Sequence, residues 1–284
     1  MNDPDERKPV RWTPGTVMVH AFLYLFAFAT LYPILQIVTI SLRPSDQLYS
    51  TSLALIPEGA TLKAYGVMLT QKPFLRWLAN SAIVSLAVTL FGVTLASTAA
   101  YAFSRFRFRG WRAGLYLFLL TQMFPATMLM LPMYVLMRTL GLLDTFAGLV
   151  VAYTATALPF CVWTMRGYYD TIPVELEQAA LIDGCTPWQA FTRITLPLAS
   201  PALAITALFS FMAAWSEFLV ARIVLSRQEL FTLPLGLESL AGQFQTEWAN
   251  YAAGSLMVCV PVMVLFVLLN RSLVSGLSLG GVKG

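Results

Sequence analysis

The residues that could carry out chemistry in this chain are few and do not form a catalytic set. His20 is the single histidine, and Cys161, Cys185 and Cys259 show no Cys-x-x-Cys spacing that would indicate a zinc site or a disulfide frame. The sequence has no phosphate-binding Gly-Lys-Ser/Thr loop and no Gly-x-Ser-x-Gly nucleophile turn. We therefore expect no catalytic residue, no metal site and no cofactor held by this chain itself.

A polar stretch at residues 176–197, LEQAALIDGCTPWQAFTRITLP, lies between long apolar runs. Pro173 favours a helix start just before it, because proline suits the first helical turn. Glu175 and Glu177 then lie near the positive end of the helix dipole, where carboxylates are stabilising. Gly184 fits the left-handed position that closes a helix at its C-terminus. The pattern predicts a short helix that ends at this glycine.

A second short helix is predicted directly after the glycine. Thr186, Pro187 and Gln189 have the spacing of a capping box with proline at the first helical position. We expect this helix to run to about Ile194 and to end at Leu196-Pro197. Two short helices joined by a sharp turn would form a compact knob.

The knob has two alternative roles. The small side chains of Ala179 and Ala180 would let another surface approach closely, and apolar Leu181, Trp188 and Phe191 could fill a socket on a partner. Alternatively, the knob is an interfacial connector that only covers the helix bundle. The residues alone leave both alternatives open.

Composition places the elements around the knob in a membrane. The 284 residues are 58% hydrophobic and only 11% charged, whereas soluble domains carry about 25% charged residues. A bilayer crossing takes about 20 residues, and its backbone must be hydrogen-bonded internally, so each long apolar run is predicted to be a helix. The six runs are 17–42, 77–104, 113–136, 146–165, 201–225 and 251–270. The sequence thus predicts an all-α integral membrane protein with six transmembrane helices.

Basic residues predict the orientation of these helices. Eleven lie at the termini and in the loops 105–112 and 166–200, and seven lie in the other loops. Because Lys and Arg are enriched in cytoplasmic loops, both termini and the knob are predicted to be cytoplasmic in a multi-pass plasma-membrane protein. Segments 43–76 and 222–250 are predicted to face outside.

The knob also resembles a known motif, the EAA loop of ABC importer permeases. That motif has Glu-Ala-Ala, three residues, Gly, nine residues and Ile-x-Leu-Pro, and here Ala179-Ala180, Gly184 and Ile194-x-Leu196-Pro197 have this spacing. The acid differs, because Gln178 stands at the motif's Glu position and Glu177 precedes it, about 100° around a helix.

Other segments are similar to the carbohydrate branch of this family, the maltose/maltodextrin type. They are SLRP at 41–44, WLANS at 77–81, YAFSRFRFRG at 101–110 and GGVKG at 280–284. The resemblance implies a type I importer permease fold, with a cytoplasmic segment 1–16, a permease domain 17–275 holding the coupling loop 171–197, and a cytoplasmic tail 276–284.

The resemblance also implies partners and roles. It implies a second permease subunit, two ATPase subunits that bind ATP and Mg, an extracytoplasmic sugar-binding protein and membrane lipid, with no nucleic acid. The implied ATPase-coupling residues are Glu177, Gln178, Ala179, Ala180, Gly184, Ile194, Leu196 and Pro197. A thin tail of Gly280, Gly281, Val282, Lys283 and Gly284 is implied to reach the ATPases, and the alternative is a disordered terminus.

Four residues inside the runs are candidates for the substrate path. A carboxylate within a span is costly and usually faces a cavity or a partner, so Glu217 with Trp215 could line a sugar path. The alternative is an ion pair of Glu217 with Arg222 or a bond to a neighbouring helix. Asn80 and Gln122 could also face a pore, although hydrogen bonds between helices are the alternative for both.

The polar segment 240–251 between the last two runs is a candidate contact for the binding protein. The residues suited to it are Gln243, Gln245, Trp248 and Asn250, and the alternative is a re-entrant loop that seals the pore mouth.

The predicted function is therefore a permease subunit of an ATP-driven importer of an oligosaccharide such as maltose or maltodextrin. Alternatives are permeases for trehalose, other glycosides or glycerol phosphate. An ion-coupled secondary transporter would show several intramembrane ionisable groups and broken spans, whereas only Glu217 stands out here.

Overall fold

The computed structural model of the chain describes residues 13–44, 56–241 and 246–281, with side chains as far as residue 268. Within these ranges every regular element is a helix, apart from one isolated β-bridge between Ala241 and Thr246. The predicted all-α class is therefore confirmed.

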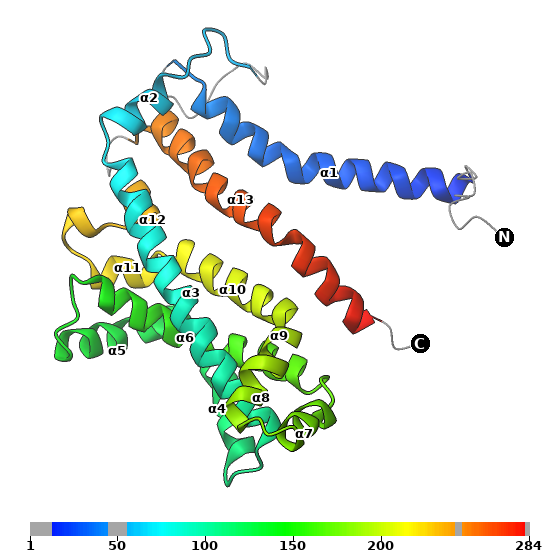
Figure 1. Cartoon of the computed structure of the whole chain (residues 1–284). Coiled ribbons are helices and arrows are strands. Elements are labelled where there is room, and N and C mark those ends of the chain that lie inside the picture. The colour runs from blue at the N-terminus through cyan, green and yellow to red at the C-terminus, as the bar shows by residue number, and fades with distance from the viewer. Residues whose placement is uncertain (1–12, 45–55, 242–245, 282–284) are drawn as a thin grey trace.

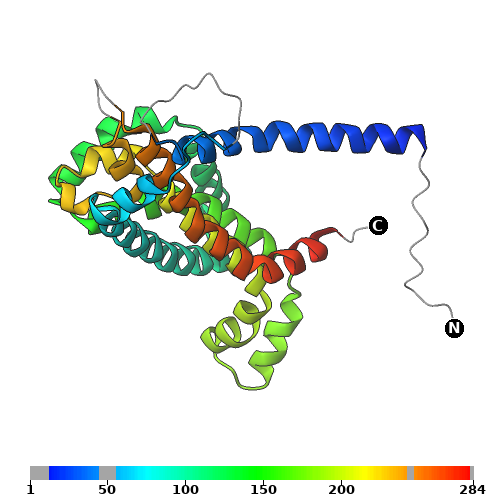
Figure 2. The same cartoon turned by 90° about the horizontal axis from the view of Figure 1, so that it is seen from above.

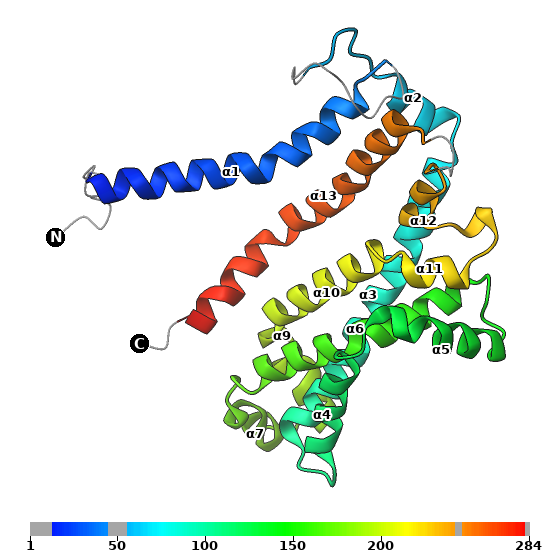
Figure 3. The same cartoon turned by 180° about the vertical axis from the view of Figure 1, so that it is seen from behind.

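Three long helices pack against one another at the centre of the molecule (Figures 1 and 3). They are α3 (Phe74–Arg105), α6 (Phe146–Tyr169) and α10 (Ser200–Trp215). Their shared core has two parts, one rich in large side chains around Trp77 and Trp215, the other rich in alanine around Ala96 and Ala157. The small residues let the helix backbones approach closely, as is usual between helices in membranes.

Four helices are long and apolar enough to cross a membrane unaided. They are α1 (Pro14–Ser41), α3, α6 and the first part of α13 (Trp248–Gly281). Two bent pairs of helices would raise the number of spans in the described residues to six.

The first bent pair replaces the helix predicted over 113–136. α4 (Trp111–Thr121) and α5 (Ala126–Thr139) form an angle of 105°, so the prediction of one continuous helix is wrong. Pro125 lies at the break in an extended conformation. The cause is local, because the residue before a proline is disfavoured in the helical region.

The prediction of one helix over 201–225 is wrong for the C-terminal part of that range. α10 ends at Trp215, and the chain turns into the short α11 (Leu219–Val224). A 3₁₀ turn, η2 (Gln228–Leu230), and α12 (Leu233–Glu238) follow and pack on α3. Gly236 of α12 touches the Trp77 ring so closely that a Cβ would clash with it.

α1 stands away from the central helices and packs mainly against α13 (Figures 1 and 2). No residue in the apolar window of α1 is buried in the isolated chain. At the far end, α2 (Lys63–Thr70) packs on the first turns of α13. We call this region the α2 end, and the opposite region, with the α3–α4 turn and residues 174–198, the knob end.

The C-terminal tail differs from the expected thin strand. α13 stays helical through Gly280 and Gly281, so an extended tail from 276 onward is wrong. Val282, Lys283 and Gly284 lie outside the described residues.

Candidate functional site

The first half of the knob forms as its sequence predicts. α7 (Val174–Ile182) follows Pro173, and Gly184 has a φ of +88°. Thr186 accepts a hydrogen bond from the Gln189 N–H, and the Gln189 side chain accepts one from the Thr186 N–H. The capping box and the glycine turn are therefore confirmed.

The second half of the knob is longer than predicted. α8 (Pro187–Ala190) continues as a π-helical turn, η1 (Phe191–Thr195), and then as α9 (Leu196–Leu198). The chain thus stays helical through Pro197, and the predicted end at Leu196-Pro197 is wrong. The helix breaks only at Ala199, where it bends by 78° into α10. A π-helical turn often marks a functional position, and here it lies in the helical segment that leads through α9 to the central helix α10.

A buried ion pair fastens the knob to α3. Arg105 Nε lies 2.7 Å from Glu177 Oε1, and both side chains are 8% exposed. The Tyr101 hydroxyl donates to Glu177 Oε2 at 2.7 Å. Arg105 Nη2 donates to the Ile172 carbonyl at 3.0 Å. Arg105 Nη1 donates to the Ser104 hydroxyl at 3.1 Å. Since both carboxylate oxygens and all three guanidinium nitrogens have partners, the pair meets the condition under which buried charges are tolerated.

The sequence reasoning missed Arg105 and Tyr101 as members of this site. Seventy-two residues separate Arg105 from Glu177, so no local spacing links them. A second tie lies beside the first, where the Ser104 hydroxyl donates to Asp170 Oδ1 at 2.6 Å. The end of α3 and the start of the knob therefore form one connected joint.

The knob presents only part of its predicted docking face. Trp188 is 64% exposed, Leu181 is 45% exposed and Gln178 and Ala179 are exposed. Phe191 is only 4% exposed because its ring packs 4.5 Å from that of Tyr101. The expectation that Phe191 fills a partner's socket is therefore wrong.

The remaining motif residues divide between the inner and outer sides of the knob. Ala180 is 7% exposed and lies inside the chain, Ile194 and Leu196 are half-buried, and Pro197 is exposed. Ala180 therefore serves packing within this chain.

Asn80 and Gln122 have different surroundings. Asn80 is buried, and its Nδ2 donates to the carbonyls of Glu229 and Phe231 at 2.9 Å each, so it holds the segment around η2 against α3. Gln122 lies at the α4–α5 break and donates to the Thr156 carbonyl at 3.0 Å. It also lines a cavity of about 280 Å³ between α4, α5, α6 and α11. Of the two, only Gln122 faces a cavity.

Trp215 and Glu217 are not brought together as a sugar site. Trp215 is 2% exposed, donates to the Val258 carbonyl at 3.3 Å, and forms the floor of a cavity of about 400 Å³. Glu217 instead accepts from the backbone N–H groups of Val220 and Ala221 at the start of α11. The expected pairing of Glu217 with Arg222 is wrong in the described residues, because the carboxylate caps a helix.

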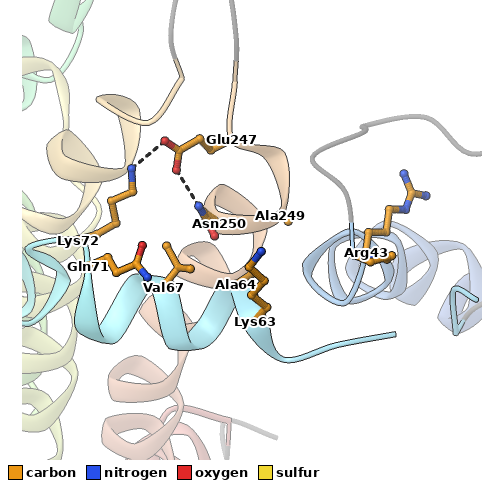
Figure 4. A pocket seen from close by; sticks show the side chains of 10 residues that line it. Arg43, Lys63, Ala64, Val67, Gln71, Lys72, Glu247, Ala249 and Asn250 are labelled. Carbon is orange, nitrogen blue, oxygen red and sulfur yellow. Dashed lines mark hydrogen bonds and ion pairs between the residues drawn. The ribbon is translucent and has the colours of Figure 1, made fainter. Parts of the chain in front are cut away.

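The α2 end carries a third cavity, of about 300 Å³, between α2 and the start of α13 (Figure 4). Lys72 Nζ lies 2.7 Å from Glu247 Oε1, and Asn250 donates to Glu247 Oε2 at 2.7 Å. The hydrogen bond from Lys72, with that from Asn250, lowers the pKa of Glu247 below its usual value. Lys63 also lines this cavity, so cations outnumber carboxylates in its wall.

The segment predicted to contact a binding protein is only partly described. Gln243 and Gln245 lie outside the described residues. Trp248 opens α13, and Asn250 faces the cavity of Figure 4. In the described part of the chain no group of His, Cys, Asp or Glu side chains could hold a metal ion.

Residues 89–275 match the family described as the binding-protein-dependent transport system inner membrane component. The chain belongs to this family. The matched residues begin in the middle of α3, include the whole knob and reach into α13. The protein is therefore a membrane permease subunit of a binding-protein-dependent transport system and not a catalytic enzyme.

Relatives in this family cover nearly the whole chain. The maltose/maltodextrin permease MalG of Escherichia coli K12 is 37% identical, over 94% of this chain and 95% of its own length. The maltodextrin permease MdxG of Bacillus subtilis is 34% identical, over 94% and 96%. The diacetylchitobiose permease DasC of Streptomyces coelicolor is 32% identical, over 95% and 98%.

A solved structure has the same architecture. A chain of a bacterial ABC transporter involved in the import of the polysaccharide alginate aligns with a TM-score of 0.79 at 25% identity. The alignment covers 92% of this permease and 98% of that chain. The predicted importer permease fold is therefore confirmed.

Proposed function

We propose that this permease forms half of the translocation pathway for maltose or maltodextrins, together with a second permease subunit. The supporting observation is the 34–37% identity, over 94% of the chain, to permeases named for these sugars. Two ATPase subunits that bind ATP and Mg would drive the transport, and an extracytoplasmic binding protein would deliver the sugar.

The knob is the part of the chain that would receive the ATPase movement. Its exposed Trp188 and Leu181 are suited to a cleft on an ATPase subunit. The Arg105–Glu177 pair ties its first helix to α3, and α9 leads into α10. A displacement of the knob would therefore move α3 and α10 together, which is a rigid-body switch between two pore states.

This role fixes the orientation that we propose. The knob end and both termini lie on the cytoplasmic side, and the α2 end faces outward. Trp248 and Asn250, with Gln243 and Gln245, would then contact the binding protein. Residues 280–284 would approach the ATPase subunits.

An uptake screen tests the proposed substrate. The assembled complex is placed in proteoliposomes with ATP inside, and uptake of labelled maltose, maltotriose, trehalose and diacetylchitobiose is compared. We expect ATP-dependent uptake of the two maltodextrins above the other sugars, and none with an ATPase subunit that cannot hydrolyse ATP. Preference for diacetylchitobiose would contradict the proposed substrate and would instead indicate the uptake for which DasC is named.

A surface variant tests the proposed role of the knob. Trp188→Ala removes an exposed aromatic anchor, so we expect several-fold weaker retention of the ATPase subunits during purification. Leu69→Ala is the matched control, because Leu69 is 46% exposed on α2 at the opposite end. Equal retention by the two variants would contradict a docking role for Trp188.

A further inference from the structure

Three arginines surround one tryptophan at the knob end. The guanidinium carbons of Arg107, Arg112 and Arg166 lie 4.8, 5.3 and 5.7 Å from the centroid of the Trp111 ring. Each distance is within the range at which a cation is attracted to an aromatic face. One ring therefore gathers three positive charges into a small region.

Carboxylates do not balance these charges in the described structure. Arg166 has Asp170 at 3.3 Å, whereas Arg107 and Arg112 have no ion-pair partner in the part of the chain that is described. Two buried donors also lack partners there, Arg166 Nε and Trp163 Nε1. Arg166 lies 5.8 Å from the Trp163 ring, so the two orphan donors belong to the same cluster. Buried N–H groups without partners are rare, so the two donors mark the cluster as a place where the protein does not satisfy its own polar groups.

The cluster lies where three apolar helices end. α3 ends at Arg105, α4 begins at Trp111, and Arg166 is in the last turn of α6. In Figures 1 and 3 these three helix ends meet beside the knob. Tryptophan and arginine at helix ends are typical of the level of the lipid headgroups.

Exposed apolar side chains flank the arginines. Phe106 is 53% exposed and Phe108 is 44% exposed, on either side of Arg107. Tyr116 and Leu117, one turn further along α4, are 63% and 61% exposed. A soluble acidic partner would not explain this apolar surround, whereas a lipid offers an anionic headgroup next to acyl chains.

We propose that Arg107, Arg112 and Arg166, arranged around Trp111, bind the phosphate of an anionic phospholipid headgroup. The guanidinium groups supply charge and paired donors suited to phosphate oxygens. Phe106 and Phe108 lie against the acyl chains. The site shares no residue with the exposed face of the knob at Leu181 and Trp188, or with the cavities lined by Gln122 and Trp215.

Lipid retention by the assembled transporter tests the site. The purified complex in mild detergent is titrated with short-chain phosphatidylglycerol, with phosphatidylcholine of equal chain length, and with inorganic phosphate, and bound lipid is measured by native mass spectrometry. The variants are Arg107→Gln/Arg112→Gln and Arg166→Gln. Arg138→Gln is the control, because Arg138 is an exposed arginine at the end of α5.

We expect wild type and Arg138→Gln to retain phosphatidylglycerol over phosphatidylcholine. The double variant should bind phosphatidylglycerol roughly 30-fold more weakly, since each basic side chain near an anionic lipid surface contributes roughly fivefold and two are removed. Equal binding of both lipids by wild type would overturn the proposal, as would an equal loss in Arg138→Gln. Displacement by inorganic phosphate alone would assign the site to a free anion. If the double variant keeps its lipid but loses the ATPase subunits, the cluster is a protein interface instead.

Discussion

The two ends of the molecule each hold an acid–base pair with the same N–O distance of 2.7 Å, yet the two pairs differ in almost everything else. At the knob end, Arg105 and Glu177 are 8% exposed, and Tyr101 and the Ile172 carbonyl complete their hydrogen bonds. At the α2 end, Lys72 is 26% exposed and Glu247 is 39% exposed. Distance alone therefore does not indicate what a pair contributes to the fold.

Burial sets the cost of breaking each pair. A buried charge that loses its partner stays in a poorly solvated site, whereas an exposed charge regains water. The knob is therefore held firmly to α3, which its proposed role in coupling requires. The α2 end is held more by packing than by charge, for example where Gly254 of α13 lies against Met68 of α2.

The largest expected effect follows from removing the buried acid. Glu177→Gln leaves the Arg105 guanidinium buried without its counter-ion, and we expect the knob to lose about 3–5 kcal/mol of stability against local unfolding. Hydrogen exchange of the backbone amides in 174–198 measures this loss, and ATP-driven uptake should fall with it. Glu175→Gln is the matched control, because Glu175 is exposed on the same helix.

A double variant distinguishes the effect of an unpaired buried charge from the effect of losing side-chain packing at the site. Arg105→Met/Glu177→Leu removes both charges, so hydrogen exchange should return toward the wild-type rate, since an apolar replacement of a buried pair is often tolerated. Unchanged exchange in Glu177→Gln would show that the pair does not hold the knob.

A smaller effect is expected at the turn of the knob. Gly184→Ala places a Cβ at a φ of +88°, where open space surrounds the residue but the left-handed backbone costs about 1–2 kcal/mol. Gly167→Ala also meets open space, but Gly167 lies inside α6, so it should be neutral or slightly stabilising. Thermal unfolding of the two variants in the same detergent measures the difference. Equal melting temperatures would contradict backbone strain at Gly184.

The sequence predicts the knob better than the bundle, for a physical reason. The turn at Gly184 and the cap at Thr186 depend on residues within one helical turn, so local rules suffice for them. The Arg105–Glu177 pair depends on α3 and α7 meeting in space, and nothing in the spacing of the four arginines in 105–112 distinguishes Arg105 from its neighbours.

The structure within the apolar runs likewise depends partly on nearby residues and partly on contacts between distant elements. Pro125 is a local signal, and the rule for residues before proline could have predicted the α4–α5 break. The end of α10 at Trp215 also has a local signal, because Ser216 and Glu217 interrupt the apolar run and Glu217 caps the helix that starts two residues further on. The position of the following segment has no such signal, because Asn80 holds it through two backbone carbonyls that are 149 and 151 residues away in the sequence. Contacts of that kind exist only in the folded chain.

The smallest effect is expected for the exposed pair. Lys72→Gln should lower stability by at most about 1 kcal/mol at neutral pH. Because Lys72 lowers the pKa of Glu247, the pair stabilises the fold fully above the usual carboxyl pKa near 4.5. This contribution is lost as the pH falls through the lowered value. When the pH is lowered from 6 toward 3, the melting temperature of the wild type should therefore fall more than that of Lys72→Gln.

Two controls distinguish this pair from general surface charge. Arg227→Gln breaks a pair of 3.7 Å whose side chains are 63% and 61% exposed, so it should leave the pH profile of melting unchanged. Raising the salt concentration should weaken the Lys72 effect, because exposed charges are screened, whereas the Glu177→Gln defect should persist. If Lys72→Gln destabilises the protein as much as Glu177→Gln in high salt, burial does not explain the difference between the two ends.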